Sequence, residues 1–176
     1  MNTKTTVISQ AELDAQFACC DKIAAYWQIK GRTPTAYVET YGCQQNEADS
    51  ERIRGMLRAS GYEIVDTEEG ADCIVINTCA IREHAEKRVY GHLGRLSHTK
   101  AAKPDQIICL CGCMAQQKVV ADKVKNSYHH VDLVLGPQAE WRLPELLHEV
   151  YTKNKRVFSI ENEHGRIAED LPIVRE

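Results

Sequence analysis

Short apolar runs alternate with helical stripes along this chain, and that alternation limits what it can fold into. Residues 73–77 and 107–111 are nearly unbroken apolar runs, as in strands that are buried on both faces. Each run is followed by a segment whose apolar positions recur at helical spacing. Strands and helices that alternate in this way form a parallel sheet covered by helices. We therefore predict an α/β fold, with a parallel Rossmann- or flavodoxin-like sheet and helices on both of its faces.

The same periodicity predicts where the elements lie. Strands are expected over residues 36–41, 62–65, 73–77, 107–111, 131–135 and 156–160. Helices are expected over residues 46–59 and 81–96, through Val120 and Val124, and from Pro144 to Val150. Asn46 can cap the first of these helices, and Gly61 can end it. We expect one α/β domain at residues 34–160, followed by a linker at 161–176.

An N-terminal helical extension is predicted over residues 1–33. Residues 9–30 are typical of a single helix, which Gly31 can close and which Pro34 prevents from continuing. Its apolar stripe runs through Leu13, Phe17, Cys20, Ile23 and Trp27. We expect this helix to pack on the α/β domain as an appendage.

The cysteine content is high for a chain that shows no sign of export. The chain has 176 residues and a formal net charge of -3, which gives it no overall basic character. Its apolar runs are too short to span a membrane, and its first residues lack the apolar stretch of a signal peptide, so we expect a cytoplasmic protein. Eight cysteines in a reducing compartment indicate metal binding or redox chemistry rather than disulfides.

Three of the cysteines occupy equivalent places in the pattern. Cys43, Cys79 and Cys113 each follow a predicted strand and precede a helix, at separations of 36 and 34 residues. Crossovers in a parallel sheet bring the carboxyl ends of the strands to one edge, so these thiols should become neighbours. Helix N-termini stabilise thiolate, the form that binds metal, and Gly42 and Gly112 allow tight turns beside two of the cysteines. The spacing predicts one metal site.

The other five cysteines are not expected to be ligands. Cys19 and Cys20 are neighbours on a helix and point in different directions. Cys73 begins a strand at the opposite edge, and Cys109 and Cys111 lie within a strand, where packing explains them. Structural zinc normally takes four ligands, whereas an iron–sulfur cubane held by three cysteines leaves one iron open. The three-cysteine pattern therefore favours the cluster.

Around these cysteines the sequence resembles the N-terminal domain of the radical-SAM methylthiotransferases, most closely the branch that modifies tRNA. The matching stretches are ETYGCQQN at 39–46, DSE at 49–51, NTCAIR at 77–82 and GCMAQ at 112–116. The resemblance implies that Cys43, Cys79 and Cys113 hold an auxiliary [4Fe–4S] cluster. It also implies a reaction that adds a methylthio group to C2 of isopentenyladenosine next to the anticodon. The implied partners are tRNA, a sulfur donor and a radical-SAM domain in cis.

The family's radical-SAM motif, Cys-x-x-x-Cys-x-x-Cys, does not occur in this chain. S-adenosylmethionine and a second [4Fe–4S] cluster belong to that domain, so we expect the chain to be a fragment that is inactive by itself. Two alternatives have other functions: a flavodoxin-like electron-transfer module and a zinc-stabilised interaction domain. The first strand is not followed by a phosphate-binding loop rich in glycine or hydroxyl groups, which counts against the flavodoxin-like module.

Four polar residues could support the cluster without binding it: Asn46, Asn77, Thr78 and Arg82. Asn46 could equally well belong to a helix N-terminus, whereas Asn77 and Thr78 are expected mainly to cap the next helix, with hydrogen bonds to the cluster as a secondary role. Arg82 could instead pair with Glu86 one helical turn later. Residues 82–103 carry six Lys or Arg against two acidic residues. That basic segment either contacts RNA phosphates or is an ordinary solvated helix face.

Overall fold

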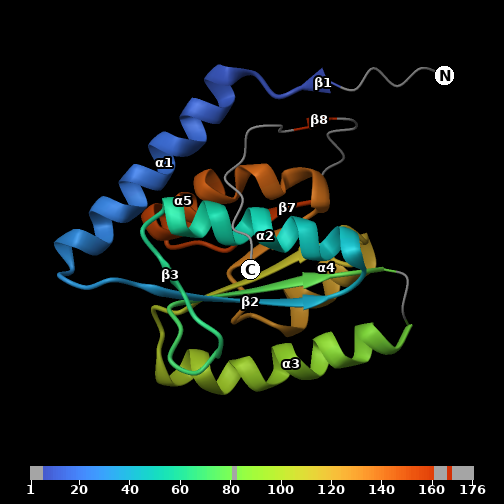
Figure 1. The fold of residues 1–176 in the computed structure, drawn as a ribbon. Coiled ribbons are helices and arrows are strands. Elements are labelled where there is room, and N and C mark those ends of the chain that lie inside the picture. Colours follow the sequence, from blue (N-terminus) through green and yellow to red (C-terminus); the bar gives the residue numbers. More distant parts are fainter. Residues whose placement is uncertain (1–5, 81–82, 161–165, 168–176) are drawn as a thin grey trace.

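A six-stranded parallel sheet forms the centre of the molecule (Figure 1). The computed structural model describes residues 6–80, 83–160 and 166–167. The strands are β2 (Thr35–Tyr41), β3 (Glu63–Ile64), β4 (Cys73–Thr78), β5 (Ile107–Gly112), β6 (Leu133–Leu135) and β7 (Val157–Ser159). Their order in the sheet is β3-β2-β4-β5-β6-β7, and every pairing is parallel. This confirms the predicted α/β class.

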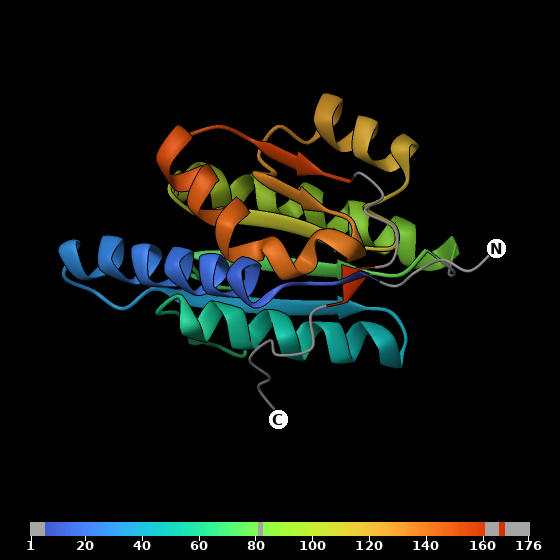
Figure 2. The same ribbon diagram turned by 90° about the horizontal axis from the view of Figure 1, so that it is seen from above.

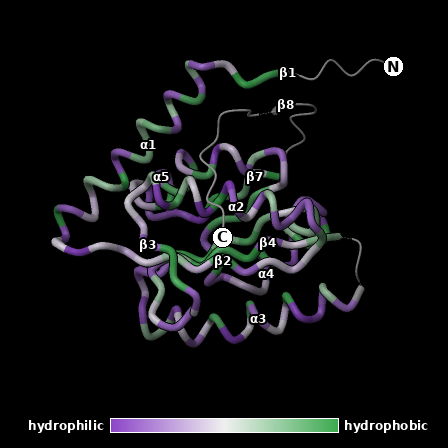
Figure 3. The backbone as a smooth tube through the Cα atoms, viewed as in Figure 1, coloured by the Kyte–Doolittle hydropathy of each residue, from purple (hydrophilic) through white to green (hydrophobic). Residues whose placement is uncertain are grey.

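Helices cover both faces of this sheet, and each face has its own apolar core (Figures 1 and 2). The helices are α1 (Gln10–Ile29), α2 (Gln44–Ala59), α3 (Glu83–Ala102), α4 (Lys118–Ser127) and α5 (Leu143–Lys153). One core joins α1, α2 and α5 to Val75 and Cys109, whereas the other joins α3 and α4 to Ile74 and Ile108. Alternate strand residues thus point to opposite faces. The hydrophobic colour in Figure 3 gathers accordingly on the central strands.

Helix α1 belongs to the first of these cores rather than standing apart from it. It packs against α5 and α2, and Ile23 and Trp27 lie in the same apolar cluster as residues of the sheet. Ser9 caps the helix in a capping box with Glu12. Phe17 does not join the buried stripe, because it is 38% exposed, so that part of the prediction was wrong. The domain boundary at residue 33 stays a prediction.

Two features were absent from the predicted pattern. A 3₁₀ helix, η1 (Pro137–Arg142), connects β6 to α5, and short strands β1 (Thr6–Val7) and β8 (Arg166–Ile167) pair in parallel. Both are too short to generate a recognisable periodicity. The predicted linker at 161–176 lies, apart from β8, outside the described residues. Among the helices described, none has the length and apolar character that a membrane crossing requires.

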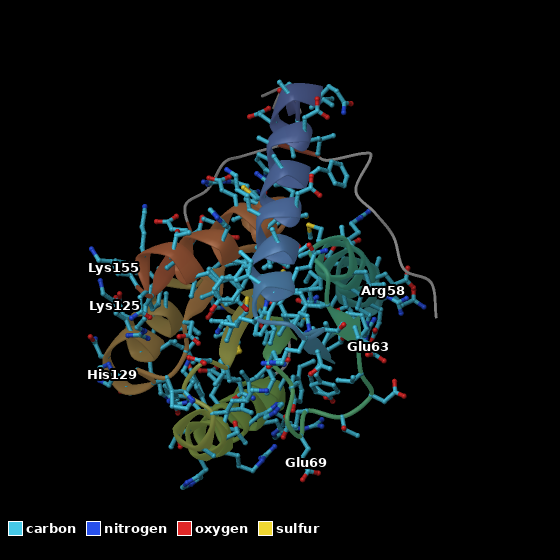
Figure 4. All side chains as sticks on the ribbon, turned by 90° about the vertical axis from the view of Figure 1, so that its left-hand side faces the viewer. Arg58, Glu63, Glu69, Lys125, His129 and Lys155 are labelled. Atoms are coloured by element: carbon cyan, nitrogen blue, oxygen red, sulfur yellow. The ribbon has the colours of Figure 1, made fainter. Side chains whose placement is uncertain are left out.

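Asp72 organises the edge of the sheet at which the strands begin. Its buried carboxylate accepts hydrogen bonds from both terminal nitrogens of Arg32, at 2.9 and 2.6 Å, and from the Thr35 N–H at 2.8 Å. The ammonium of Lys103, the residue after helix α3, pairs with it at 2.6 Å. Figure 4 views this end of the molecule, where charged side chains such as Arg58 and Glu63 point outward around the rim.

Candidate metal centre at the carboxyl end of the sheet

The strand register places the three cysteines at one edge. Tyr41, Thr78 and Gly112 are direct neighbours in β2, β4 and β5. Cys43 follows its strand by two residues, whereas Cys79 and Cys113 follow theirs by one. This is the arrangement that their spacing predicts.

Backbone hydrogen bonds continue past the strand ends and hold the cysteine loops together. The Cys79 N–H donates to the Tyr41 carbonyl at 2.8 Å, and the Cys113 N–H donates to the Thr78 carbonyl at 3.0 Å. The position of each of these cysteines relative to the preceding strand is therefore set by the main chain. No side chain takes part in either contact.

The three thiols differ in their surroundings, and Cys79 affects the pKa of both of the others. Cys43 is exposed, and the backbone N–H groups of Asn46 and Gln45 at the start of α2 lower the pKa of its thiol. A hydrogen bond with the Cys79 side chain lowers it further. At Cys113, burial and then the charges of Cys79, Glu140, Asp49 and Cys43 raise the pKa. Cys79, only 5% exposed, lies between these loops.

Asn46 joins the loop of Cys43 to that of Cys79. Its Oδ1 accepts from the Cys43 N–H at 3.2 Å and from the Cys43 thiol at 3.3 Å. Its Nδ2 donates to Asn77 Oδ1 at 3.2 Å and to the Thr78 carbonyl at 3.1 Å. The prediction that Asn46 is the N-cap was wrong: Cys43 is the N-cap, and Asn46 is the third helical residue, reaching back to it.

Asn77 and Thr78 are fully buried; Asn77 joins β4 to helix α2, and Thr78 joins β4 to β5. Asn77 Nδ2 donates to the Asn46 carbonyl at 2.9 Å and to Ser50 Oγ at 3.0 Å. Thr78 Oγ1 donates to the Cys111 carbonyl at 2.6 Å. The prediction that they cap the next helix was therefore wrong. Arg82 lies outside the described residues.

The two glycines before Cys43 and Cys113 are required by close packing inside the protein. A Cβ atom at Gly112 would lie 2.2 Å from the Thr78 carbonyl oxygen, and its φ of +94° is one that other residues rarely adopt. A Cβ atom at Gly42 would lie 2.2 Å from Asn46 Oδ1. These glycines admit the contacts that hold the loops together. The chain bends at Gly42 and turns directly after Gly112, and both glycines lie close to other protein atoms.

The other cysteines lie where packing accounts for them. Cys73, Cys109 and Cys111 are at most 1% exposed and belong to the core beneath α1, α2 and α5. Burial raises the pKa of the Cys73 thiol, and a hydrogen bond with Cys109 followed by burial raises that of Cys111. Cys19 and Cys20 are on α1, where burial raises both pKa values.

The donor set suits a cofactor with several irons. Three thiols from three loops converge on one edge, and the helix N-terminus at Cys43 favours thiolate. Within the part of the chain that the structure describes, no group of three or more His, Cys, Asp or Glu side chains is arranged so that it could hold a metal ion.

The charges of α3 are divided between its two ends. Lys100 pairs with Asp132 at 2.8 Å and Lys103 pairs with Asp72, both at the edge where the strands begin. At the cysteine end, the Arg88 guanidinium lies 5.2 Å from the centre of the Tyr41 ring. A hollow of about 530 Å³ opens there. It is lined by Glu39, Thr40, Tyr41, Gly42, His84, Ala85 and Arg88.

Sequence reasoning missed Glu140, which η1 places near the cysteine edge. It is 7% exposed, and its charge acts on Cys113 and Cys111. Its position depends on a short 3₁₀ helix that periodicity does not reveal, so no sequence signal pointed to it.

Residues 35–136 match the family described as "Uncharacterized protein family UPF0004". Several curated proteins called tRNA-2-methylthio-N(6)-dimethylallyladenosine synthase are similar to the chain. The protein from Geobacillus thermodenitrificans is 44% identical over 145 residues, which are 82% of this chain and 28% of that protein. The Clostridium botulinum (strain Eklund 17B / Type B) protein is 42% identical over 139 residues, 79% of this chain and 30% of that protein. The chain thus spans under a third of these relatives.

Proposed function

Since this chain belongs to the UPF0004 family, we propose that it is the N-terminal, cluster-binding domain of a tRNA methylthiotransferase. The proposed reaction is the addition of a methylthio group to C2 of isopentenyladenosine next to the anticodon, in the cytoplasm. S-adenosylmethionine, a second [4Fe–4S] cluster, a sulfur donor and a radical-SAM domain in cis complete the proposed enzyme. This chain alone is proposed to be inactive.

The observation that carries the proposal is the alignment of Tyr41, Thr78 and Gly112 in adjacent strands. It supports Cys43, Cys79 and Cys113 as the three ligands of an auxiliary [4Fe–4S] cluster. When bound, such a cluster would supply an iron that no cysteine occupies, where sulfur could be held for transfer.

The chain's own residues prepare that site. The first turn of α2 stabilises the Cys43 thiolate through its backbone N–H groups. Asn46, Asn77 and Thr78 hold the loops at a fixed separation through the hydrogen bonds described above. Arg82 remains a proposed neighbour of the cluster on sequence grounds alone.

We propose that, within the basic segment at residues 82–103, the end of α3 near the cysteines is the part that contacts RNA. Lys100 and Lys103 are already paired with acidic residues, whereas Lys87 and Arg88 are exposed near the cysteine edge. Cations near the reacting edge suit the phosphate backbone of a tRNA substrate.

The flavodoxin-like and zinc-binding alternatives account for fewer of these features. The flavodoxin-like module does not explain why three thiols meet at one edge beside a helix N-terminus that favours thiolate. Structural zinc normally takes four ligands, and this edge brings together three cysteines. The family membership also points away from both of them.

Anaerobic reconstitution of the full chain with iron and sulfide tests the proposal. We expect about four irons and as many acid-labile sulfides per chain, with little zinc or flavin. Changing Cys79→Ala should abolish iron retention, whereas the control Cys19→Ala, on α1, should retain it. Zinc or flavin bound in place of iron, or retention by Cys79→Ala, would contradict the proposed ligands.

A further inference from the structure

The face of β2 on the α3 side of the sheet carries polar side chains. Tyr37, Glu39 and Tyr41 alternate along β2 and share this face. The neighbouring strand β4 instead places Ile74 and Ile76 in the core beneath α3. A hollow of about 530 Å³ opens on this face, where β2 ends and α3 begins on the same side of the molecule (Figure 1). None of the cysteines is among the described residues that line it, so a group bound there lies beside the candidate metal centre rather than at it.

Tyr41, which lines the hollow, is held at its hydroxyl end by a pair of side chains. The hydroxyl oxygen lies 3.1 Å from His92 Nδ1, and the centres of the two rings are 6.0 Å apart in an edge-to-face contact. His92 is 2% exposed, and its Nε2 is paired with the carboxylate of Glu68. A buried imidazole is costly where an apolar side chain would pack. Through His92, Glu68 thus fixes the Tyr41 ring at the hollow.

Arg88 and Glu39 bring opposite charges to the same hollow. The Arg88 guanidinium, from an exposed position of α3, lies 5.2 Å from the centre of the Tyr41 ring. A planar guanidinium layered on an aromatic ring offers a flat surface on which a nucleobase stacks. The Glu39 carboxylate accepts a hydrogen bond from the Tyr37 hydroxyl through one oxygen, and its second oxygen is also an acceptor. A carboxylate repels phosphate but accepts a hydrogen bond from an amino group.

We propose that this hollow binds an unpaired nucleobase that carries an exocyclic amino group. The base stacks on the Arg88–Tyr41 pair, and its amino group donates to the Glu39 carboxylate. The inference rests on the proposed function for the source of the base, an RNA substrate, and assigns to the hollow a nucleotide other than the one that is modified. At the basic end of α3, it gives Arg88 a base contact and leaves Lys87 for the phosphates.

Titration of the metal-free full chain with nucleosides tests this site, with the backbone amide resonances of Gly42 and Ala85 as the readout. Adenosine and purine riboside are the probes, because they differ only in the exocyclic amino group. Both should shift these resonances. Adenosine should bind about tenfold more tightly, the factor expected for one hydrogen bond to a charged acceptor. Inorganic phosphate, the third probe, should not shift them.

Three variants assign the contacts. Arg88→Ala should weaken the binding of both nucleosides about tenfold, because it removes the stacking surface. Glu39→Ala should lower the affinity for adenosine to that for purine riboside. Arg95→Ala is the matched control, since this exposed arginine lies on the same helix but does not line the hollow, and it should leave both affinities unchanged. If Glu39→Ala does not fold, the comparison of the two nucleosides in the wild type still decides.

Several outcomes would overturn the proposal. They are equal affinities of the wild type for adenosine and purine riboside, an unchanged affinity in Arg88→Ala, and an equal loss in Arg95→Ala. Shifts caused by phosphate without binding of nucleosides would also overturn it, because the hollow would then be an anion site. Iron reconstitution is a separate readout. A wild type that binds nucleosides but retains no iron would overturn the proposed cluster and leave this site standing, whereas the reverse result would overturn this site alone.

Discussion

At the scale of single residues, the Asn46 side chain holds the loops of the cysteine edge together through its hydrogen bonds. Asn46 bonds to the backbone and thiol of Cys43, to Asn77 and to the Thr78 carbonyl, although it is almost fully buried. A buried amide with all its groups paired becomes costly to remove, because its partners lose their bonds as well.

Asn46→Ala should lower the free energy of unfolding by about 2 kcal/mol, since it leaves the Cys43 N–H and Asn77 Oδ1 without these partners. Urea unfolding followed by circular dichroism measures the change. Gln44→Ala, exposed two residues earlier in the same helix, should change stability by less than about 0.5 kcal/mol. Equal effects of the two substitutions would contradict this role.

The location of the thiols could be predicted because it follows from crossover length and parallel direction, which the cysteine spacing reflects. The roles of Asn46, Asn77 and Thr78 could not, because a polar residue near a helix start fits a cap as well as a tie between neighbouring elements. Glu140 could not be predicted either, since its place depends on how η1 lies across β5. Those details come from packing between segments far apart in the sequence.

At the scale of elements, the end of β5 is packed too closely for any side chain at Gly112. The left-handed φ of this residue and its contact with the Thr78 carbonyl act together. Helix α3 offers the opposite case, because a Cβ atom at Gly91 would meet no atom within 4 Å. Alanine substitutions at Gly112 and Gly91 therefore distinguish the effect of close packing from the effect of helix propensity.

Gly112→Ala should destabilise the domain by about 3 kcal/mol, because it adds backbone strain and overlap with a neighbouring strand. Gly91→Ala should stabilise it by about 0.5–1 kcal/mol, since alanine favours an exposed helix position. Thermal and urea unfolding of both variants measure these changes. A tolerated alanine at position 112 would show that β4 and β5 are not held as closely as described.

At the scale of the whole molecule, the two ends of the sheet have different roles. The cysteine end carries the candidate metal centre, and the opposite end is fastened by the Asp72 contacts. Burial raises the pKa of Asp72, but hydrogen bonds from Arg32, Lys103 and Thr35 outweigh it and hold that pKa well below its usual range. The carboxylate therefore contributes stability above its unfolded pKa of about 3.9, and this contribution is lost as the pH falls further.

Asp72→Asn should cost about 2 kcal/mol at neutral pH and should flatten the acid side of the stability profile. Wild type should lose more stability than the variant between about pH 5 and about pH 2, measured by urea unfolding at each pH. Asp105→Asn, at an exposed carboxylate 3.9 Å from Lys30, serves as the control and should behave like wild type. Parallel profiles for wild type and Asp72→Asn would rule out this account.

The backbone bonds from Cys79 to Tyr41 and from Cys113 to Thr78 have a consequence for how freely this region can vary. Because main-chain atoms make them, exchanging the side chain of Tyr41 leaves the first contact in place. A change of length is another matter. One residue inserted between Thr78 and Cys79 would move that thiol by about 3.3 Å and turn it to the other side of the chain. The side chain of Tyr41 can therefore change without loss of this contact, whereas the number of residues between Thr78 and Cys79 cannot change.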